Sequence, residues 1–299
     1  MGEMPIVPEP QHEQKTHASF AMSVDVEDYF QVWAFSSAVS RSSWDGFSLR
    51  VGDAARRCLD LFDEHDVKGT FFTLGWVAER DRPLIRQIVD RGHELASHGY
   101  DHTKVNEQDR AAFFQDVQRT KKLLEDISGA NVAGYRAAGF SIDETTPWAY
   151  DTLAEVGHTY SSSVHPIKHD HYGDQHAPQT PYRPLSSSPF IEAPVATVNF
   201  LGQRISCAGG GWFRAFPYAA YRQLLNRAAN RLNGPVIFYF HPWEIDPDQP
   251  RIKSVSARSR FRHYLNLKSM TPKLKRLLKA HPWRRIDETL DLFRREHTA

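Results

Sequence analysis

Residues 67–98 read VKGTFFTLGWVAERDRPLIRQIVDRGHELASH and are the clearest guide to the architecture. A short run rich in β-branched and aromatic residues (67–74) precedes an amphipathic segment with helical spacing (82–92) and a second short apolar run (93–98). This order predicts a strand, a helix and a second strand, which is the repeating unit of a parallel sheet.

The same alternation continues on both sides of this unit. Before it, SFAMSVDV (19–26) predicts a strand and VGDAARRCLDLFDEH (51–65) predicts a helix. After it, the pattern predicts helices over 107–128, 148–155, 217–232 and 285–296, and strands at 132–137, 159–164 and 234–241, with a strand pair at 193–205. A long ordered loop is expected over 165–194, and CAGGGWF (207–213) is expected to be a tight turn or a substrate-facing loop. The chain is therefore predicted to be an α/β protein.

The composition is that of an ordinary globular protein, with 40% hydrophobic and 24% charged residues. A formal net charge of +1 gives no overall field that would attract nucleic acid, so nucleic acid is not an expected partner. Two cysteines without a CxxC pair, Cys58 and Cys207, exclude a disulfide scaffold and a Cys-rich zinc site. They favour a reducing compartment.

The domain organisation is predicted to be simple. Residues 1–17 contain no apolar segment of a signal peptide and are expected to form a flexible leader, and no stretch is long and apolar enough to span a membrane. A cytoplasmic location is therefore expected. Residues 18–299 are predicted to form one domain, with a catalytic barrel over about 19–246 and an extension over about 247–299.

Ionisable residues follow four of the predicted strands, at the edge where parallel α/β sheets collect their chemistry. They are Asp25, Glu27 and Asp28, then His98 and His102, then Arg136, and finally His241. Each type has an ordinary structural role as well: carboxylates cap helices, histidines at spacing four can decorate a helix surface, and an arginine can form a salt bridge. Together they cost desolvation free energy unless they meet one another or a metal.

This set of side chains suits one kind of chemistry. Two imidazoles and one carboxylate are a three-ligand set typical of catalytic zinc or a similar divalent ion. A second carboxylate can accept a proton from water, and a histidine across the site can protonate the leaving group. The pattern therefore indicates metal-assisted hydrolysis of an amide or ester.

At these residues the sequence resembles the polysaccharide deacetylases, the NodB-like carbohydrate esterases of family 4, over roughly residues 19–246. The motifs that carry the resemblance are SVDVED (23–28), SHGYDH (97–102), YRAAGFSI (135–142) and FYFHPWEID (238–246). Together with SSVHPIKHDHYG (162–173), CAGGGWFR (207–214) and SRFRHYLNL (259–267), they are closest to the deacetylases found with exosortase-linked exopolysaccharide loci.

The resemblance implies a distorted, seven-stranded (β/α) barrel that binds one divalent metal, usually zinc, and removes N-acetyl groups from the amino sugars of a glycan. It makes Asp25 the general base, Arg136 the residue that positions this base, and His241 the general acid. His98 and His102 become metal ligands. The third ligand is Glu27 or Asp28, and we expect only one of them to bind.

Some features leave alternatives open. Relatives usually carry an aspartate where Ser161 stands, so the partner that orients His241 is not identified. His165, His169 and His171 are either a second metal cluster or part of a polar loop. The rival functions are a small-amide or cyclic-amide hydrolase on the same scaffold and a catalytically degenerate glycan-binding barrel.

A basic segment marks the C-terminal extension. Ten Lys and Arg and no Asp or Glu lie between Arg251 and Ala280. These charges are either solvated or in weak contact with an anionic glycan or membrane surface. Leu274, Leu277 and Leu278 are expected to pack against the barrel, which would keep the segment ordered.

Overall fold

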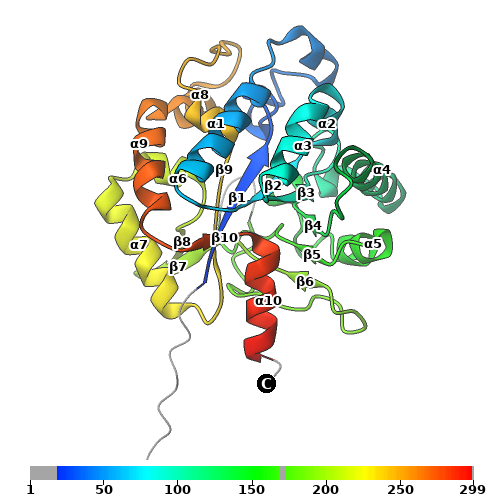
Figure 1. The fold of residues 1–299 in the computed structure, drawn as a ribbon, viewed down its shortest axis with the longest axis vertical. Helices are drawn as coiled ribbons and strands as arrows, with labels where there is room; N and C mark the ends of the chain where they lie inside the picture. Colours follow the sequence, from blue (N-terminus) through cyan, green and yellow to red (C-terminus); the bar gives the residue numbers. More distant parts are fainter. Residues whose placement is uncertain (1–18, 169–172, 298–299) are drawn as a thin grey trace, which may run out of the picture.

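The structure is a computed structural model that describes residues 19–168 and 173–297 of the 299-residue chain. The predicted leader and two histidines of the predicted cluster, His169 and His171, lie outside the described residues. Figure 1 shows a curled sheet with helices along its outer side.

Eight parallel strands form the main sheet in the order β10-β1-β2-β3-β4-β5-β6, with β9 paired to the free side of β1. β1 is therefore central, since it pairs with β9, with β2 and, through its first two residues, with β10. The strands are β1 (Phe20–Val26), β2 (Thr70–Thr73), β3 (Glu94–Ser97), β4 (Gly134–Tyr135), β5 (Tyr160–Ser161), β6 (Ile191–Glu192), β9 (Val236–Phe240) and β10 (Trp283–Arg284).

The two ends of this sheet are linked. The segment that follows β6 stays beside β5, where the Ala193 N–H donates to Ser161 O at 2.7 Å. Three residues later, the Ala196 N–H donates to Ile237 O of β9 at 3.0 Å. The sheet of β1–β6 and β9 is thereby curled, so the predicted α/β barrel of seven strands is confirmed, with β10 as a short eighth strand.

Burial explains why the apolar pattern of the sequence predicts these strands. Every residue of β1, β2, β3 and β9 is buried, because helices cover the outer face and side chains fill the inner one. Parallel strands covered on both faces are near-continuous apolar runs, such as VIFYF in β9.

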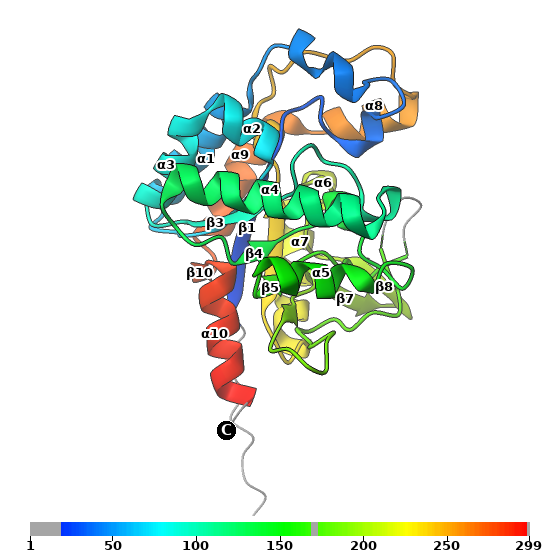
Figure 2. The ribbon, with the colours of Figure 1, turned by 90° about the vertical axis from the view of Figure 1, so that its right-hand side faces the viewer.

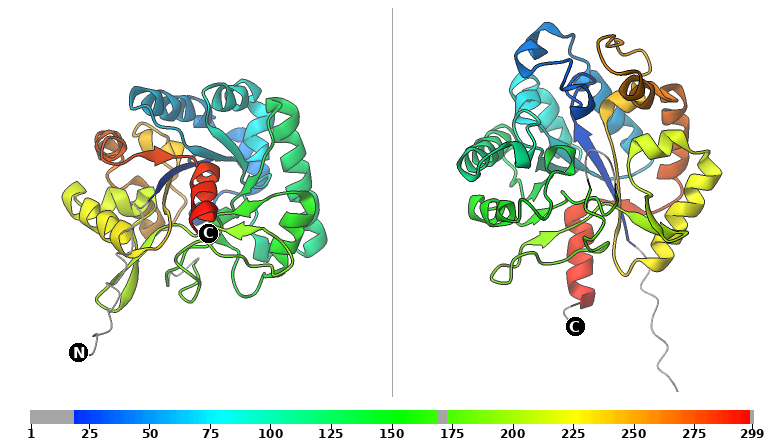
Figure 3. Two further views of the ribbon diagram at one scale, coloured as in Figure 1. Left: turned by 60° about the horizontal axis from the view of Figure 1, so that its bottom comes forward. Right: turned by 180° about the vertical axis from the view of Figure 1, so that it is seen from behind.

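Helices surround the sheet, and α10 extends beyond the end at which the strands begin (Figures 1 and 3). The α-helices are α1 (Val51–Glu64), α2 (Gly75–Arg80), α3 (Arg82–Asp90), α4 (Arg110–Ser128), α5 (Trp148–Val156), α6 (Gly210–Ala215), α7 (Tyr218–Arg231), α8 (Ala257–Tyr264), α9 (Leu267–Leu278) and α10 (Ile286–His297). Short 3-10 helices are η1 (Trp33–Phe35), η2 (Arg41–Gly46), η3 (Val105–Glu107), η4 (Ala138–Phe140) and η5 (Pro242–Ile245). None of the helices in the described part of the chain has the length and apolar character needed to cross a membrane.

Three local predictions need correction. The loop expected over 165–194 contains the short strand β6, which pairs with β5. The helix expected to begin at residue 107 begins at Arg110, because the Asp109 side chain caps it by accepting the Ala112 N–H. CAGGGWF is not a tight turn, since Gly210 opens helix α6. The predicted strand pair is confirmed as the hairpin of β7 (Thr197–Phe200) and β8 (Gln203–Ser206).

The C-terminal extension packs back onto the barrel, as predicted. Leu274, Leu277 and Leu278 of α9 are buried, and β10 joins the sheet beside β1. Figure 2 shows α8 and the chain that follows β1 together at one end of the molecule, opposite α10. At this end of the molecule, Phe35 of η1 packs on His263 of α8, with ring centroids 4.6 Å apart.

Candidate active site

The carboxyl ends of β1, β3, β4 and β9 bring most of the predicted site residues into one place. Asp25 is in β1, His98 directly follows β3, Arg136 follows β4 and His241 follows β9. A cavity of about 400 Å³ opens between them, and Asp25, Glu27, His98, His102 and His241 all line it. The arrangement follows from parallel strands, whose carboxyl ends meet at one edge.

Glu27, His98 and His102 form a trio with the chemistry of a metal site. Each offers one ligand atom, and these atoms lie within 4.8 Å of one another. His102 Nε2 is 3.1 Å from Glu27 Oε2, which is buried and accepts no hydrogen bond from the residues that the structure describes. A buried carboxylate oxygen without a donor, beside two imidazoles, fits a divalent ion such as zinc.

The backbone sets the tautomer of His98. Its Nδ1 is 2.8 Å from the carbonyl oxygen of Arg136, which can only accept a hydrogen bond, so Nδ1 carries the proton and Nε2 keeps its lone pair. Burial lowers the pKa of His98, and it lowers the pKa of His102 to about 4. Both rings are therefore neutral, as metal ligation requires.

The loop that carries His102 has an unusual backbone. His102 has φ = 61°, in the left-handed region that non-glycine residues rarely occupy, and Gly99 has φ = 73°. Asp116 of α4 braces this loop by accepting the Tyr100 N–H at 2.9 Å. Strained backbone of this kind persists where the surrounding structure fixes it, which is common at functional sites.

Asp28, the other candidate ligand, does not join the trio. Its Oδ1 accepts the Tyr29 N–H at 2.8 Å, and its Oδ2 accepts the N–H groups of Arg50 and Val51 at 2.8 and 2.9 Å. Because these amides open α1, Asp28 caps that helix. The sequence left Glu27 and Asp28 both as candidate ligands, whereas in the structure only Glu27 lies with the two histidines.

Asp25 and Arg136 form a buried ion pair in the floor of the cavity. Arg136 Nη1 is 2.6 Å from Asp25 Oδ1 and also donates to Ser23 Oγ at 2.9 Å, and its other nitrogens donate to the backbone and side-chain oxygens of Ser162. Burial raises the pKa of Asp25, but the charge and hydrogen bond of Arg136, together with the interactions with His98 and His241, outweigh it and hold this pKa below its usual value. Asp25 is therefore a fixed carboxylate with one oxygen, Oδ2, left towards His241.

His241 faces the cavity with one ring nitrogen and a buried carboxylate with the other. Its Nε2 is 3.5 Å from Glu27 Oε1 and 3.9 Å from Asp25 Oδ2. Its Nδ1 is 2.9 Å from Glu244 Oε1, and Glu244 in turn pairs with Arg214. Sequence reasoning singled out neither Glu244 nor Arg214, although the HPWE spacing of three residues was a signal for the first.

Ser161 does not contact His241. Its hydroxyl donates to Ser163 Oγ at 2.6 Å, and the nearby Glu192 carboxylate accepts the N–H groups of Ser163 and Val164. The sequence did not identify the residue that orients His241, and in the structure this residue is Glu244.

Aromatic side chains form much of the cavity wall. Trp33, Phe140, Trp212, Tyr239 and Trp243 all line it. Trp243 also stacks on His241, with centroids 5.1 Å apart, and donates from Nε1 to Glu27 Oε1 at 3.3 Å. Flat aromatic faces beside polar groups are typical of a site that binds an amphipathic ligand such as a sugar.

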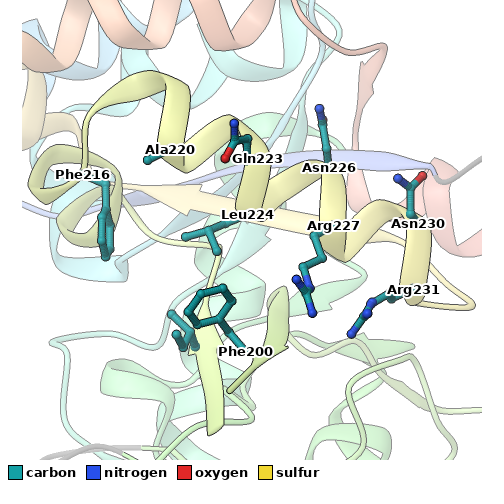
Figure 4. A pocket seen from close by; sticks show the side chains of 10 residues that line it. Phe200, Phe216, Ala220, Gln223, Leu224, Asn226, Arg227, Asn230 and Arg231 are labelled. Atoms are coloured by element: carbon teal, nitrogen blue, oxygen red, sulfur yellow. The ribbon is translucent and has the colours of Figure 1, made fainter. Parts of the chain in front are cut away.

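Two other features lie apart from this site. A cavity of about 680 Å³ between α7 and the β7–β8 hairpin is lined by Phe200, Leu224 and Arg227 among others, but by none of the predicted site residues (Figure 4). His165 is buried with Nε2 3.0 Å from Ser206 Oγ. Among the described residues, the trio of Glu27, His98 and His102 is the group that could hold a metal. The other two histidines of the predicted second cluster, His169 and His171, lie outside the described residues.

Comparison with protein families divides the chain into two matched regions. Residues 44–161 match the polysaccharide deacetylase family, and residues 162–291 match a domain of unknown function, DUF3473. The first region contains His98, His102 and Arg136, and the second contains His241. The match over residues 44–161 agrees with the family predicted from the motifs.

Curated relatives are deacetylases of N-acetylated glycans. The peptidoglycan-N-acetylglucosamine deacetylase of Listeria monocytogenes is 31% identical over 71 residues, which are 24% of this chain and 15% of that protein. The chitooligosaccharide deacetylase of a Bradyrhizobium species is 26% identical over 107 residues, which are 36% of this chain and 47% of that protein. The matches therefore span less than half of either relative.

A solved structure supports the fold. A Mycobacterium smegmatis protein described as a polysaccharide deacetylase superposes with a TM-score of 0.62, covering 98% of this chain and 96% of that one. The sequence identity is 19%, so this likeness shows the fold alone.

Proposed function

We propose that the chain, whose residues 44–161 match the polysaccharide deacetylase family, is a metal-dependent hydrolase that removes N-acetyl groups from the amino sugars of a polysaccharide or its precursor. Exopolysaccharide biosynthesis is the proposed setting, on the resemblance of its motifs to that branch, and a cytoplasmic location stays a prediction from the sequence. One observation carries the proposal: a fixed carboxylate, a trio of metal-type ligands and a histidine meet in a single cavity.

Glu27, His98 and His102 would hold the metal, with zinc as the proposed ion. The donor set of two imidazoles and one carboxylate is common for catalytic zinc and keeps a coordination position free. When bound there, the ion would supply Lewis acidity to the acetamide carbonyl. The chain itself prepares this site through the fixed tautomer of His98 and the buried Glu27 oxygen.

Asp25 is the proposed proton acceptor. Arg136 occupies Oδ1 and keeps the group ionised, so Oδ2 is the oxygen left to take a proton from the attacking water. Arg136 cannot give up its own proton and is held by Ser23 and Ser162, so its role is to orient the carboxylate.

His241 is the proposed proton donor to the departing amine. Its Nδ1 is bound by Glu244, which leaves Nε2 as the atom directed into the cavity, beside Asp25 and Glu27. A glycan chain would reach this atom between the aromatic walls, where sugar rings can stack on Trp33 or Trp212.

A negatively charged glycan is the proposed partner of α8. Arg262 of this helix lines the catalytic cavity, and Arg260 and Phe261 beside it are exposed, Phe261 to 65%. Three cations of α9 are engaged elsewhere: Lys275 pairs with Glu64 at 2.8 Å, Lys273 donates to the Phe216 carbonyl, and Arg276 lies over the Tyr218 ring. Of the basic segment, α8 is thus the part placed to meet substrate charge, which favours a glycan over a membrane surface.

The test is acetate release from acetylated amino-sugar oligomers by the zinc-loaded protein. The proposal requires acetate with the wild type, and much less from the metal-free protein and from Asp25→Asn. Hydrolysis of small or cyclic amides without acetate release from any glycan would favour the rival hydrolase. Glycan binding without hydrolysis of either would favour a degenerate barrel.

A further inference from the structure

The partner of His241 is held in place from two directions. Glu244 Oε1 is 2.9 Å from His241 Nδ1 and also accepts the His241 backbone N–H at 3.1 Å. A single carboxylate oxygen therefore fixes the ring and the backbone of the same residue, as the short helix η5 begins. Because the carboxylate accepts at Nδ1, the proton that His241 can deliver sits on Nε2.

Arg214 fixes the other oxygen of this carboxylate. Its Nε donates to Glu244 Oε2 at 2.7 Å, and its remaining nitrogens donate to the carbonyls of Arg262, His263 and Leu265. The side chains of Arg214 and Glu244 are 2% and 1% exposed. The guanidinium thus ties the carboxylate to the turn between α8 and α9.

A buried ion pair of this kind needs a reason beyond stability, because the desolvation of two charges offsets most of their attraction. Burial raises the pKa of Glu244, but the charge of Arg214 and the bond to His241 lower it to about 2. Glu244 is therefore a carboxylate next to His241 at neutral pH.

The glycine-rich segment makes room for this carboxylate. A Cβ on Gly210 would meet both carboxylate oxygens of Glu244 at distances that real Cβ atoms essentially never show. Gly211, the next residue, would meet nothing within 4 Å. The requirement for glycine at position 210 comes from Glu244 and links the CAGGGWFR and FHPWEID motifs physically.

Other carboxylates do not reach Nδ1. Among the described residues, those near the His241 ring are Asp25 and Glu27 at Nε2, and Glu244 at Nδ1. The strand position at which relatives usually carry an aspartate is Ser161, whose hydroxyl donates to Ser163. Oε1 of the Glu192 carboxylate beside it accepts the backbone N–H groups of Ser163 and Val164.

We propose that Glu244 and Arg214 are positioning residues for the reaction, and that they hold His241 in the orientation that delivers its Nε2 proton. This inference rests on the proposed function. It also gives a task to the region matched by a domain of unknown function, since His241, Glu244, Arg214 and the carbonyls that hold Arg214 all lie within residues 162–291. That region completes the proton-donating side of the site.

The first test is Glu244→Gln, which keeps the shape and removes the charge. We expect kcat on an acetylated amino-sugar oligomer to fall by at least about 100-fold, while KM and zinc content stay within about twofold of the wild type. Glu94→Gln is the matched control, because Glu94 is also buried but bonds Thr70 and Tyr160 at the far end of the sheet. Its kcat should be unchanged.

A second variant covers the case in which loss of the ion pair unfolds the protein. Arg214→Lys keeps the charge and should retain more kcat than Arg214→Met, with KM unchanged in both. In proton NMR, the downfield signal of a histidine Nδ1–H held by a carboxylate should be present in the wild type and in Glu94→Gln and absent in Glu244→Gln.

The outcomes separate this inference from the proposed function. A wild-type protein that shows the NMR signal but releases no acetate from any glycan would refute the function and leave the geometry intact. A folded, zinc-loaded Glu244→Gln variant with wild-type kcat would overturn the positioning role while the deacetylase function stands.

Discussion

Arg136 Nη1 lies 2.6 Å from Asp25 Oδ1, and the two side chains are 0% and 3% exposed. The remaining donors of Arg136 are all directed at Ser23 and Ser162, so the guanidinium cannot turn away. Asp25 is therefore presented to the cavity with a fixed orientation and a fixed charge. A carboxylate with a fixed orientation and a fixed charge is suited to accept a proton from a water molecule held at one position in the cavity.

Replacing Asp25 by asparagine should abolish proton acceptance and keep the shape of the site. We expect acetate release by Asp25→Asn to fall by at least about 100-fold while zinc remains bound, because the ligand trio is untouched. Acetate release and elemental analysis on the same sample check this. An active variant would mean that another carboxylate is the base.

Metal content should separate Glu27 from Asp28. His98→Ala and Glu27→Gln each remove one member of the trio, so both should lose most of their zinc by elemental analysis. Asp28→Asn should keep its zinc, because Asp28 caps α1, and it should instead lose about 0.5–2 kcal/mol of unfolding free energy. Zinc loss in Asp28→Asn alone would reverse the assignment.

The sequence predicted the parallel sheet and the site-bearing strand ends because both leave local signals. Apolar runs such as VIFYF mark buried strands, and an ionisable residue directly after one, such as His241, is conspicuous. The sequence did not decide between Glu27 and Asp28 as the metal ligand, because the role of Asp28 depends on residues far from it in the chain. Asp28 accepts the amides of Arg50 and Val51, which lie 22 and 23 residues further on.

The partner of His241 also depended on tertiary contacts. Glu244 is three residues from His241, but its orientation is set by Arg214, which is 30 residues away in the sequence. CAGGGWF was expected to be a turn or loop because three glycines favour irregular backbone. The structure instead begins helix α6 at Gly210, where the carboxylate of Glu244 lies too close for a side chain.

Gly210→Ala and Gly211→Ala form a matched pair for stability. The added methyl at Gly210 collides with Glu244, so its unfolding free energy should fall by about 1–3 kcal/mol. The same methyl at Gly211 meets open space in a helix and should be neutral or stabilising by about 0.5–1 kcal/mol. Chemical denaturation measures both, and equal effects would contradict the packing described.

Glu192 should make stability depend on pH. Burial raises its pKa from 4.5 to about 7, so the folded state binds its proton more tightly than the unfolded state does. Its stabilising contribution is complete below pH 4.5 and is lost as the pH rises through about 7. Glu192→Gln resembles the protonated form. The melting temperature of the variant minus that of the wild type should therefore be higher at pH 8 than at pH 5.

The exposed Glu155→Gln is the control for this pH effect, because its side chain is solvated in the folded and unfolded states alike. Its melting temperature should differ from the wild type by the same amount at both pH values. The same constancy in Glu192→Gln would show that the buried carboxylate does not titrate in this range.

The cations of α8 give the last prediction, because Arg262 reaches the catalytic cavity and those of α9 are engaged elsewhere. Lys273 Nζ donates to the Phe216 carbonyl at 2.8 Å, and the Arg276 guanidinium lies 4.0 Å from the centre of the Tyr218 ring. If α8 contacts a charged glycan, KM for an anionic N-acetylated oligosaccharide should rise with salt, since exposed charges are screened over about 8 Å at physiological ionic strength.

Removing two of these charges should therefore mimic high salt. In Arg260→Gln/Arg262→Gln, KM for the anionic oligosaccharide should rise about 3- to 10-fold and lose most of its salt dependence, because each exposed ion pair contributes about 0.2–1 kcal/mol. KM for a neutral oligosaccharide should stay unchanged. Lys275→Gln removes a charge of the same basic segment, but one that pairs with Glu64, so it should affect neither substrate. Equal KM values for both oligosaccharides at every ionic strength would show that the arginines of α8 are solvated and do not contact the substrate.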